Sequence, residues 1–205
     1  MQKRRFNILF LLSIFLITYG YAFVRYHLGK ELLELIHIPF VLNKAIAWTA
    51  GTYLVLSLIP DLYLLTFNIV RRELGMLGYL LAVIHICSGI LLLRPNLYPK
   101  FFTDDVLNNS GWIYIFFGIC ALIAFSFPLY ASLKKAPPSD FRFRFGKLGI
   151  VMVLFHVVAI GVTGWFEPLK WPLFLPPITL LFAVYTMVVI TIRSFFISDN
   201  SSKKT

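Results

Sequence analysis

The sequence predicts an all-α membrane protein, a polytopic bundle of six transmembrane helices with both termini in the cytoplasm. The 205-residue chain is 59% hydrophobic and only 14% charged, and its mean hydropathy of +0.82 is far above that of a water-soluble domain. Apolar runs of about 20 residues recur along it, each long enough to cross a bilayer as a helix. They lack the strict alternation of barrel strands. We therefore expect the chain to work within a lipid bilayer.

The six apolar runs define the expected spans in order. They are approximately Phe6–Phe23, Val41–Thr66, Leu74–Leu93, Gly111–Leu129, Gly146–Trp165 and Pro172–Ile192. The first follows a basic stretch and resembles a signal peptide, but no small-residue cleavage site follows it, so we interpret it as a retained anchor. The last opens on prolines 172, 176 and 177, which suit the entry of a helix better than its middle.

The distribution of basic residues orients the bundle. With a cytoplasmic N-terminus, 13 of the 19 Lys and Arg residues fall on the inner side, as expected for an integral, multi-pass protein of a bacterial inner membrane. The net charge of +10 does not indicate nucleic-acid binding, because these residues separate apolar runs instead of gathering on one solvated face. Cys87 and Cys120 lie within apolar runs, which indicates small core residues and not a disulfide framework.

Two histidines lie inside expected spans, His85 in the third and His156 in the fifth. His85 is 13 residues beyond Arg72 and His156 is 12 beyond Arg144, so at roughly 1.5 Å per residue both lie just under ~20 Å from the inner flank. A strongly polar side chain at that depth costs free energy unless it has a partner, which makes it a functional-site hypothesis. The alternative is an imidazole hydrogen-bonded to a neighbouring helix.

Glycines accompany both histidines at helical spacing. Gly78 and Gly149 each precede a histidine by seven residues, and Gly89 follows His85 by four, so each glycine shares its histidine's face. Bare helix surface beside an imidazole leaves room for a flat macrocycle, although close helix packing is the alternative. A heme held by two axial histidines explains both features, and its filled coordination favours electron transfer. A bare zinc or copper ion needs further ligands that these spans do not offer.

These residues carry a resemblance to a known family. The stretch "RRELGMLGYLLAVIHICSGILL" resembles the third span of the ferric reductase-like transmembrane superfamily, particularly small members such as the heme-binding membrane subunit of the periplasmic methionine-sulfoxide reductase system. The likeness extends over about residues 43–193, through "NKAIAWTAGTYLVLSLIP" and "FGKLGIVMVLFHVVAIGVTGW". It implies three parts: an N-terminal anchor helix and outer loop (1–40), a heme-binding transmembrane domain (41–193) and a flexible cytoplasmic tail (194–205).

The resemblance also implies a ligand set. In that superfamily, histidines of these two spans carry heme, often as an outer and an inner pair, and His85 and His156 match the outer pair. The inner positions fall near Arg71 and Phe143, and neither is histidine. This departure from the family pattern favours one heme b instead of two.

Cations at the two ends suggest further contacts. Arg71, Arg72 and Arg144 gather on the inner side and suit the phosphate of flavin mononucleotide, a quinone headgroup or an acidic reductase surface. The alternative is ordinary positive-inside topology with contact to anionic lipid. On the outer side, we expect the heme propionates to pair with a cation from the set Arg94, Lys100 and Lys170.

The expected function is that of a membrane b-type cytochrome. It would pass electrons from a separate cytoplasmic reductase or a quinone to an outer-side partner enzyme or metal acceptor, as an oxidoreductase component without catalytic residues of its own. Two alternatives stay open. One is a structural or transport protein whose histidines bond neighbouring helices, and the other is a heme-bearing sensor or assembly factor.

Overall fold

The computed structural model describes residues 8–28, 37–59, 71–134 and 140–202, of which 140–143 and 193–202 are described by backbone alone. These residues form six α-helices: α1 (Ile8–Ala22), α2 (His37–Leu56), α4 (Arg71–Leu92), α5 (Asn109–Leu133), α6 (Asp140–Trp165) and α7 (Ile178–Ser202). Five stretches are long and apolar enough to cross a membrane: Ile8–Leu28, Arg71–Leu92, Asn109–Leu133, Arg144–Trp165 and Pro172–Ile192. The chain is thus an all-α, multi-pass membrane protein, as predicted.

The second expected span differs most from the structure. Helix α2 begins at His37, four residues before the expected start, because Pro39 is tolerated in the first turn of a helix. It ends at Leu56, and α2 is not among the five membrane-crossing stretches. Residues 60–66 of the expected span lie outside the described residues. The number of six spans therefore stays a prediction.

Several other boundaries also differ, and helix α7 ends at Ser202, ten residues past the expected end of the last span. Helix α6 begins at Asp140, six residues before the expected start, so the stretch "DFRFR" is helical. Helix α5 continues past Pro128 to Leu133. Before α7 the chain makes a short 3-10 turn at Pro172–Phe174, and the helix starts directly after Pro176 and Pro177. That placement confirms the prolines as an entry to the last helix.

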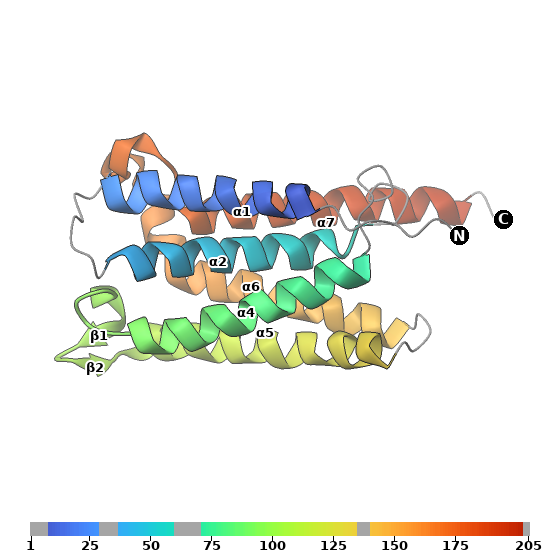
Figure 1. Cartoon of the computed structure of the whole chain (residues 1–205), viewed down its shortest axis with the longest axis horizontal. Helices are drawn as coiled ribbons and strands as arrows, with labels where there is room; N and C mark the ends of the chain where they lie inside the picture. Colours follow the sequence, from blue (N-terminus) through green and yellow to red (C-terminus); the bar gives the residue numbers. More distant parts are fainter. Residues whose placement is uncertain (1–7, 29–36, 60–70, 135–139, 203–205) are drawn as a thin grey trace.

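The helices pack side by side along one direction (Figure 1). Helix α2 packs against α4, α4 against α5, α5 against α6, and α6 makes a smaller contact back to α2. We call these four the helix ring. Within it α4 and α6 are the opposite pair, and each packs mainly on its neighbours. Helix α1 covers α2, and α7 lies against α6 and α2.

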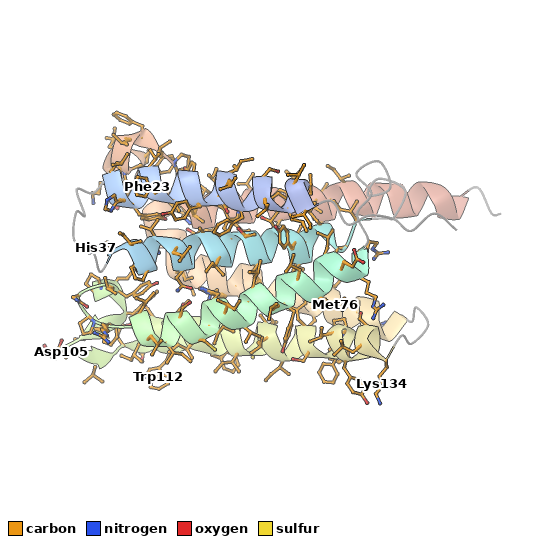
Figure 2. The ribbon with its side chains drawn as sticks, viewed as in Figure 1. Phe23, His37, Met76, Asp105, Trp112 and Lys134 are labelled. Carbon is orange, nitrogen blue, oxygen red and sulfur yellow. The ribbon has the colours of Figure 1, made fainter. Side chains whose placement is uncertain are left out.

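Apolar side chains face in both directions. A buried core joins α2 to α5, α6 and α7 through residues such as Val55, Phe125, Ile150 and Phe182. Many large apolar side chains point outward instead (Figure 2), among them Leu91, which is 71% exposed. Such a surface is unfavourable in water and suits the hydrocarbon of a bilayer.

The two ends of the bundle differ. At one end a small antiparallel hairpin pairs β1 (Phe102–Thr103) with β2 (Val106–Leu107) across Asp104 and Asp105. Both aspartates have positive φ, 51° and 62°, as tight hairpin turns require. Figure 2 places Asp105, Trp112 and His37 at this hairpin end and Lys134 at the opposite one. Helix α1 begins and α7 ends at the Lys134 end (Figure 1).

Contacts at the hairpin end link the first helix to the last. The Tyr21 hydroxyl donates to the Pro176 carbonyl at 2.6 Å, and the buried Arg25 guanidinium donates to the Leu175 carbonyl. Trp48 packs edge-on against Tyr21 with ring centroids 5.5 Å apart. The short segment before α7 is therefore held by two side chains of the first membrane-crossing stretch, Ile8–Leu28.

Candidate functional site

His85 projects from α4 toward α2, where a buried amide holds it. Its Nδ1 donates to Asn43 Oδ1 at 2.8 Å, and the Ser88 hydroxyl donates to the same oxygen at 2.7 Å. The Asn43 side chain is only 1% exposed. Because an amide oxygen accepts and cannot donate, the proton of a neutral His85 lies on Nδ1 and the lone pair on Nε2.

His156 projects from α6 toward α5 and is held by backbone. Its Nδ1 donates to the Tyr114 carbonyl at 2.9 Å, and its ring stacks on the Tyr114 ring with centroids 4.4 Å apart. Gly118, one turn further along α5, makes room for the imidazole, since a Cβ there would lie 3.1 Å from His156 Nδ1. The carbonyl can only accept, so His156 has the same tautomer as His85.

The two Nε2 atoms are the chemically available atoms of this site. Neither makes a hydrogen bond within the described part of the chain, and neither is a fully enclosed atom lacking a partner. Metal-ligating histidines show this pattern: one ring nitrogen donates to a protein oxygen, which orients the ring and raises the basicity of the other. The arrangement thus leaves two oriented nitrogen ligands.

The helix ring brings the two histidines together. They come from its opposite helices, α4 and α6, and each imidazole bonds the helix beside its own, α2 for His85 and α5 for His156. Facing helices of a bundle are where cofactor sites are built from inward-projecting side chains. Over the described ranges, no group of three or more His, Cys, Asp or Glu side chains is arranged to hold a metal ion. Two imidazoles without further ligands fit the axial positions of a heme better than a bare ion.

The expected role of the glycines needs correction. A Cβ at Gly78 would lie 3.0 Å from Leu54 and 3.1 Å from the Ala50 carbonyl of α2, and one at Gly149 would lie 2.8 Å from the Phe125 ring of α5. These two glycines therefore allow close helix packing and leave no bare surface for a macrocycle. Gly89 does share the face of His85, because both meet Asn43, whose Nδ2 would be 3.6 Å from a Cβ at Gly89.

A row of stacked rings leads from His156 toward the hairpin end. Tyr114 stacks on Phe101 at 4.9 Å between centroids, and Phe101 stacks on Tyr98 at 5.9 Å. Phe101 is 1% exposed. Burial raises the pKa of the Tyr98 hydroxyl, which lies in the loop after α4. The sequence did not reveal this row, which ties the hairpin loop to the histidine.

A further cation, Lys44, lies on the helix that bonds His85, and it was not among the candidates expected from the sequence. Lys44 directly follows Asn43, the α2 residue that bonds His85. Its ammonium is 4.9, 4.3 and 5.3 Å from the ring centroids of Tyr26, Phe40 and Tyr98.

The expected outer cations have other surroundings. Lys170 pairs with Glu167 at 2.9 Å and is 75% exposed. Lys100 donates to the Ile160 carbonyl, and Arg94 is exposed. Lys44 is therefore the better positioned candidate for an acidic group at the site.

The inner arginines lie toward the Lys134 end. Arg71 Nε donates to the Ser57 carbonyl at 2.8 Å, which ties the start of α4 to the end of α2. Arg72 and Arg144 are exposed near the starts of α4 and α6, which lie at the same end of the bundle (Figure 1). The side chain of Phe143 lies outside the described residues.

Comparisons with protein families and with curated proteins found no match to this chain. The resemblance to the ferric reductase-like superfamily therefore rests on the quoted sequence stretches alone.

Proposed function

We propose that this protein is a membrane b-type cytochrome with one heme b between His85 and His156. The observation that carries the proposal is the matched state of the two imidazoles: each donates its Nδ1 proton to a protein oxygen and leaves Nε2 without a hydrogen bond in the described residues. The two histidines come from opposite helices of the helix ring, α4 and α6. Two oriented nitrogen ligands within one bundle support axial ligation of iron.

The residues around the histidines would define the chemistry of the site. When bound, heme supplies a one-electron iron couple. His85 and His156 would each supply one nitrogen ligand to the iron, and an iron held by two protein ligands favours electron transfer over oxygen binding. Asn43 and the Tyr114 carbonyl orient the two rings, and Gly118 leaves space for one of them.

The proposal includes a topology. Six spans with both termini in the cytoplasm of a bacterial inner membrane agree with the distribution of Lys and Arg. Helix α1 begins and α7 ends at the same end of the bundle, which supports this topology (Figure 1). In this orientation the hairpin end faces outward, and the histidines lie on the path between the two sides.

Electrons would enter at the Lys134 end and leave at the hairpin end. The exposed Arg72 and Arg144, with Arg71 nearby on α4, suit flavin mononucleotide, a quinone headgroup or the acidic surface of a separate reductase. The acceptor would be a partner enzyme or a metal on the outer side.

A structural or transport protein is the second candidate, and a specific observation favours it. Each imidazole already bonds a neighbouring helix, and the packed Gly78 and Gly149 add to the same helix contacts. On that reading, loss of either histidine lowers stability and changes no optical spectrum. A heme-bearing sensor or assembly factor would share the spectrum without net electron flux.

A pyridine hemochrome assay on protein purified from heme-replete cells tests the proposal. We expect one b-type heme per chain, lost in His85→Ala and in His156→Ala. His37→Ala is the matched control, because His37 begins α2 at the hairpin end, away from the ring interior, and its loss should leave the heme content unchanged. Colourless wild-type protein, or a full heme content in either ligand variant, would contradict the proposal.

A further inference from the structure

We propose that Asn43 is a positioning residue that sets the redox potential of the site through the His85 ring. This inference rests on the proposed function and goes beyond it, because it assigns the tuning of the iron couple to a side chain on α2, a helix that carries neither ligand. The juxtaposition that carries it is the buried Asn43 amide oxygen, which accepts hydrogen bonds from both His85 and Ser88.

The surroundings of Asn43 are those of a functional amide. Its side chain is 1% exposed, and its amide oxygen accepts hydrogen bonds from two side chains of α4, His85 and Ser88. Burying an amide costs free energy unless it is hydrogen-bonded, so a residue that served helix packing alone would be apolar or would bond only its packing neighbours. Thr49 on the same helix is such a residue, since its hydroxyl bonds Thr18 Oγ1 at 2.7 Å and the Ala45 carbonyl at 2.8 Å.

The direction of the effect follows from the hydrogen bond. An acceptor on Nδ1–H raises the basicity of Nε2. A more basic ligand donates more charge to iron and stabilises the ferric form, which lowers the potential. Removal of the Asn43 oxygen should therefore raise the potential.

Ser88 makes the inference sharper, because it shares the same acceptor. Its single hydroxyl proton is shared between Asn43 Oδ1 at 2.7 Å and the carbonyl oxygens of Ile84 at 2.8 Å and His85 at 3.1 Å, so it competes in part with His85 for electron density on the amide oxygen. Ser88→Ala removes the competitor, strengthens the bond from His85 and should lower the potential. On the opposite side, His156 donates to a backbone carbonyl, which no side-chain substitution removes. Tuning by side chains therefore falls on His85.

The test is a spectroscopic redox titration of the full heme-loaded chain in detergent. Loss of a partner of this kind costs about 10–100-fold in metal affinity. We expect Asn43→Leu to weaken ferric binding about tenfold more than ferrous binding, which raises the midpoint by about 59 mV for a one-electron couple. Asn43→Asp retains an acceptor oxygen and should keep the heme with a midpoint at or below that of the wild type. Thr49→Val is the control and should leave the midpoint unchanged.

The outcomes separate this inference from the proposed function. Opposite shifts in Asn43→Leu and Ser88→Ala support it. Shifts of the same sign, or shifts no larger than that of Thr49→Val, overturn it while the cytochrome proposal stands. If Asn43→Leu retains no heme, the sign of the shift in Ser88→Ala decides, because that variant keeps both ligands. Wild-type protein without heme refutes the proposed function itself.

Discussion

Gly118 offers the most direct test of how His156 is held. An added Cβ in Gly118→Ala would lie 3.1 Å from Nδ1 and 3.2 Å from Cε1 of the His156 ring, closer than ordinary van der Waals contact. The ring would have to move by a few tenths of an ångström, and its 2.9 Å bond to the Tyr114 carbonyl would lengthen.

The magnitude follows from two opposing terms. Overpacking a filled site costs about 1–3 kcal/mol, whereas replacing glycine by alanine in a helix gains about 1 kcal/mol. The net expectation is a destabilisation of about 0–2 kcal/mol. Gly20→Ala in α1 is the matched control, because nothing lies within 4 Å of a Cβ at Gly20. The Gly20→Ala variant should gain about 1 kcal/mol of folding stability.

Thermal unfolding of both variants in detergent measures the difference. For a chain of this size, 1 kcal/mol corresponds to a change in Tm of about 2–4 °C. We expect Gly118→Ala to melt below Gly20→Ala and to contain less heme. If the two variants were equally stabilised, the His156 ring would not lie against Gly118, and the description of its pocket would be refuted.

Two further predictions concern the hairpin end. Arg25→Met removes the donor to the Leu175 carbonyl and should lower stability by about 1.5–3 kcal/mol, the usual contribution of a hydrogen bond from a charged group; an unchanged Tm in detergent would contradict this. Because burial raises the pKa of Tyr98 above its ordinary value of 10.0, the folded protein keeps a proton that the unfolded chain releases above about pH 10, so stability should fall as the pH rises further. Unfolding measured from pH 9 to pH 11 should show a smaller fall in Tyr98→Phe, and equal falls would argue against a buried hydroxyl.

The helices were largely predictable because bilayer-length apolar runs leave few alternatives for the backbone. The start of α6 was not, since the alternating "DFRFR" gives no clear helical period. The start of α2 was placed four residues late because Pro39 stands in its first turn, where a proline is tolerated. The polar residues Asn43, Lys44 and Thr49 of that helix make specific contacts.

The site was predictable only in part, for a physical reason. Depth along two helices can be counted in residues, which singled out His85 and His156. The order of helices around the ring cannot be counted, so the faces of Gly78 and Gly149 were expected to be open although they pack on α2 and α5. Asn43 could have been predicted as a site residue, because it is a polar residue within an apolar run. The Tyr114 carbonyl could not have been predicted as a partner of His156, because every residue has a backbone carbonyl and the sequence does not distinguish one from another.

The bonds from Tyr21 and Arg25 to the segment before α7 bear on how the chain is assembled. Arg25 and its acceptor are separated by 150 residues, which a ribosome takes roughly 8–30 s to synthesise at about 5–20 residues per second. During that interval the first helix has been made and its guanidinium has no native acceptor. A nascent or truncated product therefore lacks the carbonyl acceptor of Arg25 until the segment before α7 has been made.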